Sequence, residues 1–235
     1  MSDKVFYSQP GYILHQQHYR ETSLIIDVLT RDFGRITLLA KGVRKTKSKT
    51  TGILRPFNSL SLSFVGNSNL KVLTQVEQTE GTGNLSGMAL YCGFYINELI
   101  RSFLHQDDPH PEIYWDYQDC ITQLARIDFA EAALRIFEIK LMENIGYGLQ
   151  FGFDVRHRKP IDSNKKYLFN KDDGLVEDTD GAFSGSALLA MEQKDFTDPL
   201  VLIEAKKLMR TVIDARLQGK RLKSRDVINN IIKRL

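Results

Sequence analysis

Apolar and polar residues alternate along several short segments of the first eighty residues. From Ser59 to Phe64, leucine or phenylalanine occupies every second position and serine fills the positions between. A period of two is typical of a strand that buries one face. Turn-forming sequences such as Asp32-Phe33-Gly34 and Gly66-Asn67-Ser68-Asn69 separate segments of this kind. Five strands are predicted in this way, over residues 11–17, 24–28, 35–43, 59–64 and 70–77.

Five short antiparallel strands fit a small closed barrel. The OB-fold is the five-stranded barrel most closely associated with nucleic acids, and it is the topology that we expect here. An SH3-like barrel would produce much the same alternation, so the pattern by itself leaves both topologies open.

The pattern changes after Gly81-Thr82-Gly83-Asn84, where apolar residues begin to recur at helical spacing. Residues 88–104 are apolar over most of the helix circumference, as in a helix at the centre of a bundle. Further helices are predicted over residues 112–126, 128–145, 186–193, 200–217 and 226–235. Residues 147–183 instead predict an irregular insert with one small hairpin. The expected fold class is therefore α+β, with an OB-fold barrel on residues 1–80 and a helical domain on residues 81–235.

The net charge of +3 is the sum of three parts of the chain that differ strongly in charge. Residues 1–80 carry 11 basic and 6 acidic side chains, residues 81–155 carry 4 and 11, and residues 156–235 carry 17 and 12. The sharpest feature is a run of seven cations with no acid, whose Gly-, Ser- and Thr-rich middle predicts a loop. Such like charges repel one another unless an anion neutralises them, so we favour a phosphate backbone as partner over a solvated loop without one. The seven are Arg35, Lys41, Arg44, Lys45, Lys47, Lys49 and Arg55.

A second basic group lies between the last two predicted helices. It consists of Lys220, Arg221, Lys223 and Arg225. DNA contact and a solvated connection with favourable charge near a helix end explain it equally well. Ser224 is expected to cap the last helix. Candidates for base stacking are Tyr7, Tyr12, Tyr19 and Phe33, whereas Phe57 and Phe64 are expected in the barrel core.

Catalytic motifs are scarce. The chain has no G-x-x-x-x-G-K-[ST] phosphate loop and no H-E-x-x-H metal pair. Its two cysteines, Cys92 and Cys120, cannot form a disulfide framework or a four-cysteine zinc site. No segment approaches the roughly eighteen apolar residues of a membrane span, and the N-terminus lacks a secretory pattern. We therefore expect no cofactor, no metal and no membrane, and a location in the reducing cytoplasm.

Short segments, spread in order over nearly the whole chain, form a recognisable set. They are Glu21-Thr22-Ser23-Leu24, Asp27-Val28, Gly34-Arg35, Ala40-Lys41-Gly42, Pro56-Phe57, Leu90-Tyr91, Tyr95-Ile96-Asn97-Glu98-Leu99, Leu134-Arg135, Phe137-Glu138, Gly146-Tyr147-Gly148 and Leu222-Lys223-Ser224-Arg225. In these segments the chain resembles the RecO family of bacterial recombination mediators. The order of the set, rather than any one motif, carries the resemblance.

The resemblance implies an N-terminal OB-fold, a helical body and no enzymatic turnover. It implies binding of single- and double-stranded DNA, annealing of complementary strands, and binding of the acidic C-terminal tail of single-stranded DNA-binding protein. With the partner RecR, such a protein helps to load RecA onto coated DNA, in the bacterial cytoplasm and in association with the nucleoid. Some members carry four zinc-binding cysteines after the central helix. This chain has none in residues 147–183 and resembles the zinc-free branch.

The resemblance also assigns a role to Arg135 on the central predicted helix. The matching arginine of the family helps to receive the acidic tail. Ile139 and Met142, one and two turns further along, are expected to line a groove for its aromatic end. A surface ion pair with Glu131, four residues before Arg135, is the alternative.

These observations together predict a non-enzymatic mediator of DNA repair and recombination whose barrel holds one strand by its phosphates. Two alternatives stay open. A nucleic-acid-processing enzyme would use the barrel only for docking and residues 147–183 for catalysis. A protein adaptor would use the basic loop to bind an acidic protein rather than DNA.

Overall fold

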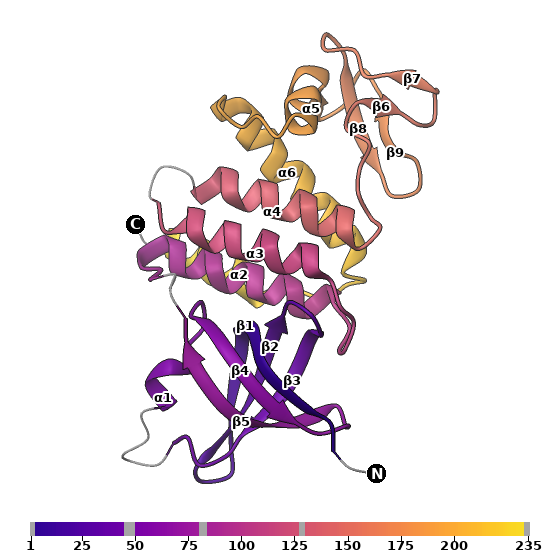
Figure 1. Cartoon of the computed structure of the whole chain (residues 1–235). Coiled ribbons are helices and arrows are strands. Elements are labelled where there is room, and N and C mark those ends of the chain that lie inside the picture. The colour runs from indigo at the N-terminus through magenta and orange to yellow at the C-terminus, as the bar shows by residue number, and fades with distance from the viewer. Residues whose placement is uncertain (1–2, 45–49, 80–83, 127–129, 233–235) are drawn as a thin grey trace. The chain divides into compact units, whose positions relative to one another are not determined.

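A computed structural model of the chain describes residues 3–44, 50–79, 84–126 and 130–232. The chain forms two compact units. Unit 1 consists of Met1–Asp128 and Leu222–Leu235, and unit 2 consists of Phe129–Arg221. The chain therefore leaves unit 1, forms unit 2 and returns to unit 1 with its last helix (Figure 1).

Unit 1 begins with a closed barrel whose strand order is β1-β2-β3-β5-β4 (Figure 1). The strands are β1 (Val5–Tyr19), β2 (Ser23–Thr30), β3 (Gly34–Ala40), β4 (Ser59–Val65) and β5 (Leu70–Gln78). Neighbouring strands are antiparallel except β3 and β5, which pair in parallel. This strand order is that of an OB-fold, so the expected topology is confirmed over the SH3-like alternative.

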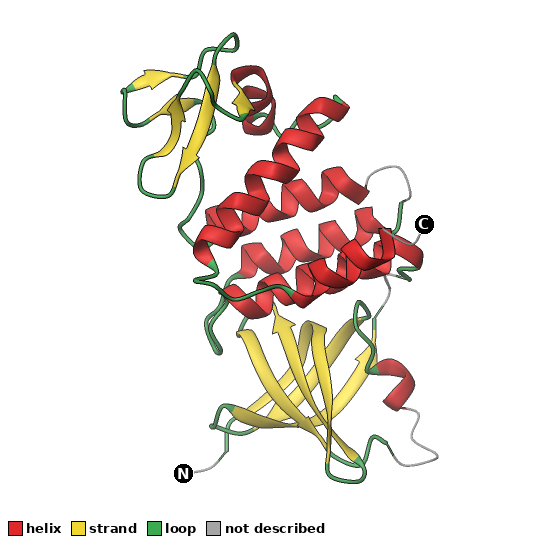
Figure 2. Ribbon diagram, turned by 180° about the vertical axis from the view of Figure 1, so that it is seen from behind, coloured by secondary structure: helices red, strands yellow, loops and turns green. Residues whose placement is uncertain are grey.

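Helices and short strands complete the two units (Figure 2). Unit 1 adds α1 (Thr50–Ile53), α2 (Gly87–Phe103), α3 (Pro111–Leu124) and α7 (Lys223–Ile232). Unit 2 contains the helices α4 (Ala130–Asn144), α5 (Gly185–Glu192) and α6 (Pro199–Arg216). Its strands are β6 (Phe153–Asp154), β7 (Lys159–Pro160), β8 (Lys166–Asn170), β9 (Gly174–Glu177) and β10 (Phe183–Ser184). Among the described residues, no helix is both long and apolar enough to cross a membrane.

The barrel core follows the alternation in the sequence. Leu60, Leu62 and Phe64 of β4 are completely buried. They belong to an interior cluster that also contains Ile13, Ile26, Val28, Ile36 and Leu38. The turn between β2 and β3 requires glycine at position 34, because its φ is +63° and a side chain there would collide with the carbonyl oxygen of Asp108.

At a bulge in β1, a backbone carbonyl of the barrel accepts a hydrogen bond from α2. The register of β1 against β2 shifts between Ile13 and His15, which frees the carbonyl of Leu14 from the ladder. That carbonyl accepts a hydrogen bond from Asn97 Nδ2 of α2 at 3.0 Å. Asn97 Oδ1 in turn accepts from the buried Tyr117 hydroxyl of α3 at 2.8 Å. This chain of bonds fixes α2 and α3 against the barrel.

Most predicted elements are present, and the structure corrects several details. The first strand begins at Val5 rather than at residue 11, and β3 pairs with β5 in parallel although antiparallel strands were expected. The third strand ends at Ala40 rather than at residue 43, and a short helix, α1, lies where the sequence predicted loop. The insert contains five short strands in two sheets, including the predicted hairpin as β8 and β9. The last helix begins at Lys223, three residues earlier than expected. The domain boundary at residue 80 stays a prediction. The two compact units divide the chain elsewhere, because contacts group α2, α3 and α7 with the barrel.

Candidate nucleic-acid interface

The structure separates the seven cations predicted to bind phosphate into three groups. Lys45, Lys47 and Lys49 lie outside the described residues. Lys41, Arg44 and Arg55 have exposed side chains on unit 1. Arg35 lies largely inside the protein, with only 17% of its side chain exposed.

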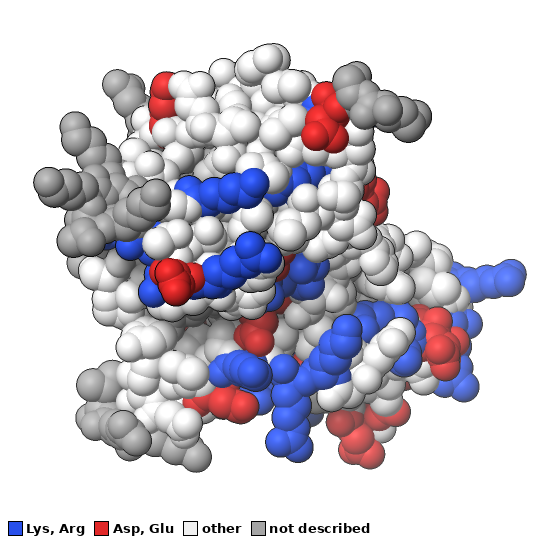
Figure 3. Space-filling model, turned by 90° about the horizontal axis from the view of Figure 1, so that it is seen from below, with Lys and Arg blue, Asp and Glu red and all other residues white. Residues whose placement is uncertain are grey.

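Lys41 and Arg44 lie in the turn after β3, and a backbone bond holds Arg44 close to the β1–β2 hairpin. The Arg44 amide donates to the carbonyl of Thr22 at 2.9 Å. The Arg44 guanidinium approaches the carbonyls of Arg20 and Glu21 at 3.5 and 3.3 Å. Arg20 and Glu21 are themselves exposed, so this end of the barrel presents three arginine or lysine side chains and one acid. Figure 3 shows one face of the molecule, on which Lys and Arg side chains lie in groups with Asp and Glu between them.

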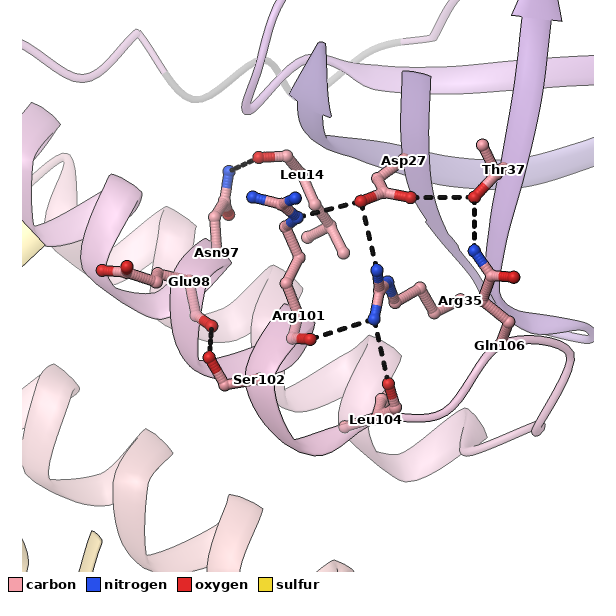
Figure 4. Close-up of polar contacts among 10 residues, drawn as sticks. All are labelled: Leu14, Asp27, Arg35, Thr37, Asn97, Glu98, Arg101, Ser102, Leu104 and Gln106. Carbon is pink, nitrogen blue, oxygen red and sulfur yellow. Dashed lines mark hydrogen bonds and ion pairs between the residues drawn. The ribbon is translucent and has the colours of Figure 1, made fainter. Parts of the chain in front are cut away.

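Arg35 has partners within unit 1 that account for its burial (Figure 4). Its Nη1 donates to the carbonyls of Arg101 and Leu104, at 2.9 and 3.1 Å, at the end of α2. Its Nη2 donates to the carboxylate of Asp27 at 3.2 Å. These bonds dock α2 on the barrel and leave little of the guanidinium for phosphate. We therefore do not propose Arg35 as a phosphate ligand.

Asp27 of β2 is the centre of this network (Figure 4). Besides Arg35, it accepts hydrogen bonds from Arg101 Nε and from the Thr37 hydroxyl, each at 2.9 Å. Burial alone would raise the pKa of Asp27, but Arg35, the Thr37 hydroxyl and Arg101 together lower it below its ordinary value. Asp27 therefore stays ionised and is the shared counter-ion of two arginines between the barrel and α2.

The second basic group is divided between the two units. Lys223 and Arg225 lie in α7 on unit 1, whereas Lys220 and Arg221 are exposed at the end of unit 2. The Arg225 guanidinium lies 5.5 Å from the centre of the Tyr95 ring. The two basic segments of the sequence thus each contribute cations to unit 1.

The start of α7 is capped by a carboxylate from another helix. Glu98 of α2 accepts hydrogen bonds from the backbone amides of Lys223 and Ser224, each at 2.9 Å, and from the Ser224 hydroxyl at 2.5 Å. The prediction that Ser224 caps the helix is therefore wrong. Ser224 is the second residue of α7, and its hydroxyl is a donor to the cap. A carboxylate at a helix N-terminus is stabilising because it satisfies unpaired amides and opposes the helix dipole.

The residues predicted to receive an acidic tail lie on α4. Arg135 donates to Glu138 at 2.8 Å, and both side chains are buried. The alternative, an ion pair between Arg135 and Glu131, is wrong, because Arg135 binds Glu138 and Glu131 binds Lys206 of α6 at 2.7 Å. Ile139 and Met142, at 2% and 1% exposure, are also buried. A tail-binding role for Arg135, Ile139 and Met142 stays a prediction.

Two sequence models of one family match the chain. The model described as "Recombination protein O N terminal" matches residues 1–82, and the model described as "Recombination protein O C terminal" matches residues 85–226. The chain belongs to the RecO family. The resemblance noted in the sequence is thereby confirmed, and the barrel corresponds to the family's N-terminal domain.

Curated relatives cover almost the whole chain. The DNA repair protein RecO of Actinobacillus succinogenes is 39% identical over 229 residues, which are 95% of this chain and 96% of the relative. The DNA repair protein RecO of Haemophilus influenzae is 38% identical over 228 residues, covering 95% of this chain and 96% of the relative. That of Paraburkholderia xenovorans is 38% identical over 233 residues, covering 97% of this chain and 78% of the relative.

The aromatic side chains predicted to stack on bases differ in their exposure to solvent. Tyr12 is 2% exposed and packs against Tyr114 and Tyr117 of α3, so the prediction that it stacks on bases is wrong. Tyr7 is 71% exposed and stays a candidate. Phe64 lies in the barrel core as expected, whereas Phe57 is buried against Phe94 of α2 rather than in the barrel core cluster.

The insert of unit 2 is held together by a buried carboxylate. Asp154 accepts hydrogen bonds from the backbone amide and ring Nδ1 of His157, at 2.9 and 2.8 Å, and from the amide of Glu177 at 2.9 Å. Glu177 also binds Lys159 and Lys165. Within the described part of the chain, no three His, Cys, Asp or Glu residues are grouped as metal ligands would be. Polar bonds of this kind connect β6, β7 and β9.

Proposed function

We propose that this RecO-family chain binds single- and double-stranded DNA and anneals complementary strands during repair and recombination, without catalytic turnover. The observation that carries the proposal is an OB-fold barrel with Arg20, Lys41 and Arg44 gathered at one end. OB-folds bind single strands by combining a cationic groove with aromatic side chains. Family membership supports the assignment, since the curated relatives are named as DNA repair proteins.

The proposed mechanism is electrostatic. The cations neutralise backbone phosphates without reading bases, so the contact is independent of sequence. Neutralising one strand lowers the repulsion that a complementary strand meets as it approaches. The proposed phosphate ligands are Lys41, Arg44, Arg55, Lys223 and Arg225, together with Lys45, Lys47, Lys49, Lys220 and Arg221 from the sequence analysis.

We further propose that the chain acts in the bacterial cytoplasm at the nucleoid, together with RecR, in loading RecA onto coated strands. The resemblance supports a contact between α4 and the acidic tail of single-stranded DNA-binding protein. Arg135 donates to Glu138 from Nη2 and its Nε has no hydrogen-bond partner among the described residues, so a tail carboxylate would share the guanidinium with Glu138. Anisotropy of a labelled tail peptide tests this contact, and it is refuted if Arg135→Ala binds the peptide as tightly as the wild type.

Salt titration tests the DNA contact directly. Affinity for a labelled single strand should fall with salt, with a slope in log–log form of about −0.7 for each phosphate contacted. Lys41→Gln should make that slope shallower by about 0.7. Lys4→Gln is the matched control, because Lys4 is exposed at the opposite end of β1 from Arg20. Absence of binding at low salt would contradict the proposal and favour an adaptor for an acidic protein.

A further inference from the structure

Unit 1 carries two grooves that share one aromatic side chain. The first, here named the α7 groove, has a volume of about 490 Å³ and lies between β1, α2 and α7. The second, here named the α1 groove, has a volume of about 450 Å³ and lies beside α1, between the segment after it and α2. Phe94 of α2 lines both grooves.

Basic and aromatic side chains line the α7 groove, and one of them, Arg101, is already paired with Asp27. Arg101, Lys223 and His15 line it together with Tyr91. Glu98 is the one acid among the described residues that line it, and its carboxylate is already bound to the start of α7. An anionic ligand in this groove would therefore meet basic side chains and a carboxylate whose charge is offset by a helix N-terminus.

The α1 groove is lined by one cation of the first basic segment. Arg55 lines it, together with Asn58 and Gln78, and no Asp or Glu is among the described residues that do so. Arg55 and Lys223 are far apart in the sequence, yet each lines a groove that borders Phe94. One cation from each basic group therefore lines a groove that Phe94 also lines.

The ring of Phe94 is both held and accessible. Phe57, which is 3% exposed, packs edge-to-face against it with the ring centres 5.2 Å apart and the planes at 63°. Phe94 nevertheless keeps 42% of its surface exposed. An exposed aromatic ring fixed by a buried neighbour is pre-organised for stacking, because little side-chain entropy is lost when a flat ligand binds.

We propose that Phe94 stacks a base of single-stranded DNA, with phosphates on either side bound by Arg55 and Lys223. The inference rests on the proposed DNA binding and extends it to a stacking residue outside the barrel. A single strand is favoured because it alternates anionic phosphates with exposed aromatic faces, as the grooves alternate cations with Phe94. A duplex hides its base faces, so this contact belongs to the single-stranded form.

Photocross-linking of the wild-type chain tests the placement. Single-stranded oligonucleotides containing 5-iodouracil would be bound at low salt and irradiated, and the adducts located after trypsin digestion. We expect an adduct in the peptide of residues 72–101, at Phe94 or Tyr91. Adducts confined to residues of the barrel, β5 included, with none in residues 87–101 of α2, would overturn the inference while leaving the proposed function intact.

Variants of Phe94 test the energetics. Phe94→Leu keeps an apolar contact with Phe57 but loses the aromatic face, and it should weaken single-strand binding about fivefold or more. Phe94→Tyr should bind as the wild type does, and duplex affinity should be unchanged in both. Trp115→Leu is the matched control, since Trp115 on α3 is 50% exposed and lines neither groove.

The outcomes separate the two levels of the proposal. Single-strand binding by Phe94→Leu as tight as by the wild type, in a variant with the wild-type melting temperature, would overturn the stacking role. Failure of the wild type to bind any oligonucleotide would refute the proposed function itself. Lys223→Gln and Arg55→Gln should each make the salt slope shallower by about 0.7, and an unchanged slope in both would contradict the phosphate contacts.

Discussion

Replacing Asp27 by asparagine should destabilise unit 1 by about 3 kcal/mol. The Asp27 carboxylate is 11% exposed and accepts hydrogen bonds from Arg35, Arg101 and Thr37 at 3.2, 2.9 and 2.9 Å. Asparagine has nearly the same shape but no charge. Two guanidinium groups would therefore lose their counter-ion at a site that is largely shielded from water.

The magnitude follows from the burial of the three side chains. Removing one partner of a buried ion pair costs roughly 3–5 kcal/mol. Arg35 and Arg101 are 17% and 33% exposed, and Arg35 keeps its two carbonyl acceptors in the variant, so the lower limit applies. A loss of 1 kcal/mol lowers the melting temperature of a chain of this size by roughly 2–4 °C. We therefore expect a decrease of about 6–12 °C.

Asp32→Asn is the matched control for this variant. Asp32 also binds an arginine, Arg31, at 2.8 Å, but the two side chains are 42% and 41% exposed. Exposed ion pairs contribute about 0–1 kcal/mol, so this variant should melt within a few degrees of the wild type. Thermal melting followed by circular dichroism compares the two. Equal melting temperatures for Asp27→Asn and Asp32→Asn would refute the claim that the Asp27 network docks α2 on the barrel.

The same carboxylate predicts a pH dependence. Burial raises the pKa of Asp27, but its bonds to Arg35, Thr37 and Arg101 outweigh burial and lower it. Because the folded pKa lies below the unfolded value of about 3.9, the stabilisation is complete at neutral pH. It is lost as the pH falls from about 4 through the folded pKa. The stability difference between the wild type and Asp27→Asn should therefore shrink over that range, and a constant difference would contradict this reasoning.

Three further predictions concern the contacts of unit 1. Arg35→Gln should lower the melting temperature and leave the salt slope of DNA binding unchanged, whereas a slope shallower by about 0.7 would restore Arg35 as a phosphate ligand. Glu98→Gln should weaken the cap of α7 by about 1 kcal/mol, measured as faster amide hydrogen exchange in residues 223–232, and unchanged exchange would argue against the cap. Asn97→Leu leaves a buried hydroxyl and a barrel carbonyl without partners, so the urea midpoint should fall by the equivalent of roughly 1–3 kcal/mol, and a wild-type midpoint would show that those bonds are unimportant.

The sequence predicted the barrel well because strand periodicity is local. Alternating serine and apolar residues in β4 placed Leu60, Leu62 and Phe64 inside, and these side chains are completely buried. The rest of the insert was harder, because strands of two residues such as β6 and β7 are too short to show a period. They form through pairing with neighbours rather than through their own pattern.

The role of Arg35 was missed because the sequence shows charge and not partners. One signal was available: the β2–β3 hairpin pairs Asp27 directly with Thr37, and Arg35 is two residues away on the same strand face. That register brings an acid within reach of Arg35. The contribution of Arg101 had no such signal, because it depends on how α2 packs on the barrel.

The tail-binding residues illustrate the limit of helical spacing. Arg135 has acids both four residues before it and three residues after it, and spacing alone does not choose between Glu131 and Glu138. In the structure, Arg135 binds Glu138, and Glu131 instead binds Lys206 of α6. Partners contributed by a second helix are decided by tertiary packing.

Strand annealing tests the central claim most directly. Two complementary labelled oligonucleotides, coated with single-stranded DNA-binding protein, would be mixed with this chain in the absence of nucleotide. The account predicts acceleration by the wild type and its loss when Lys41, Arg44, Lys45, Lys47 and Lys49 are replaced by glutamine, with folding retained in thermal melts. No acceleration by the folded wild type, or equal acceleration by the neutralised variant, would contradict it.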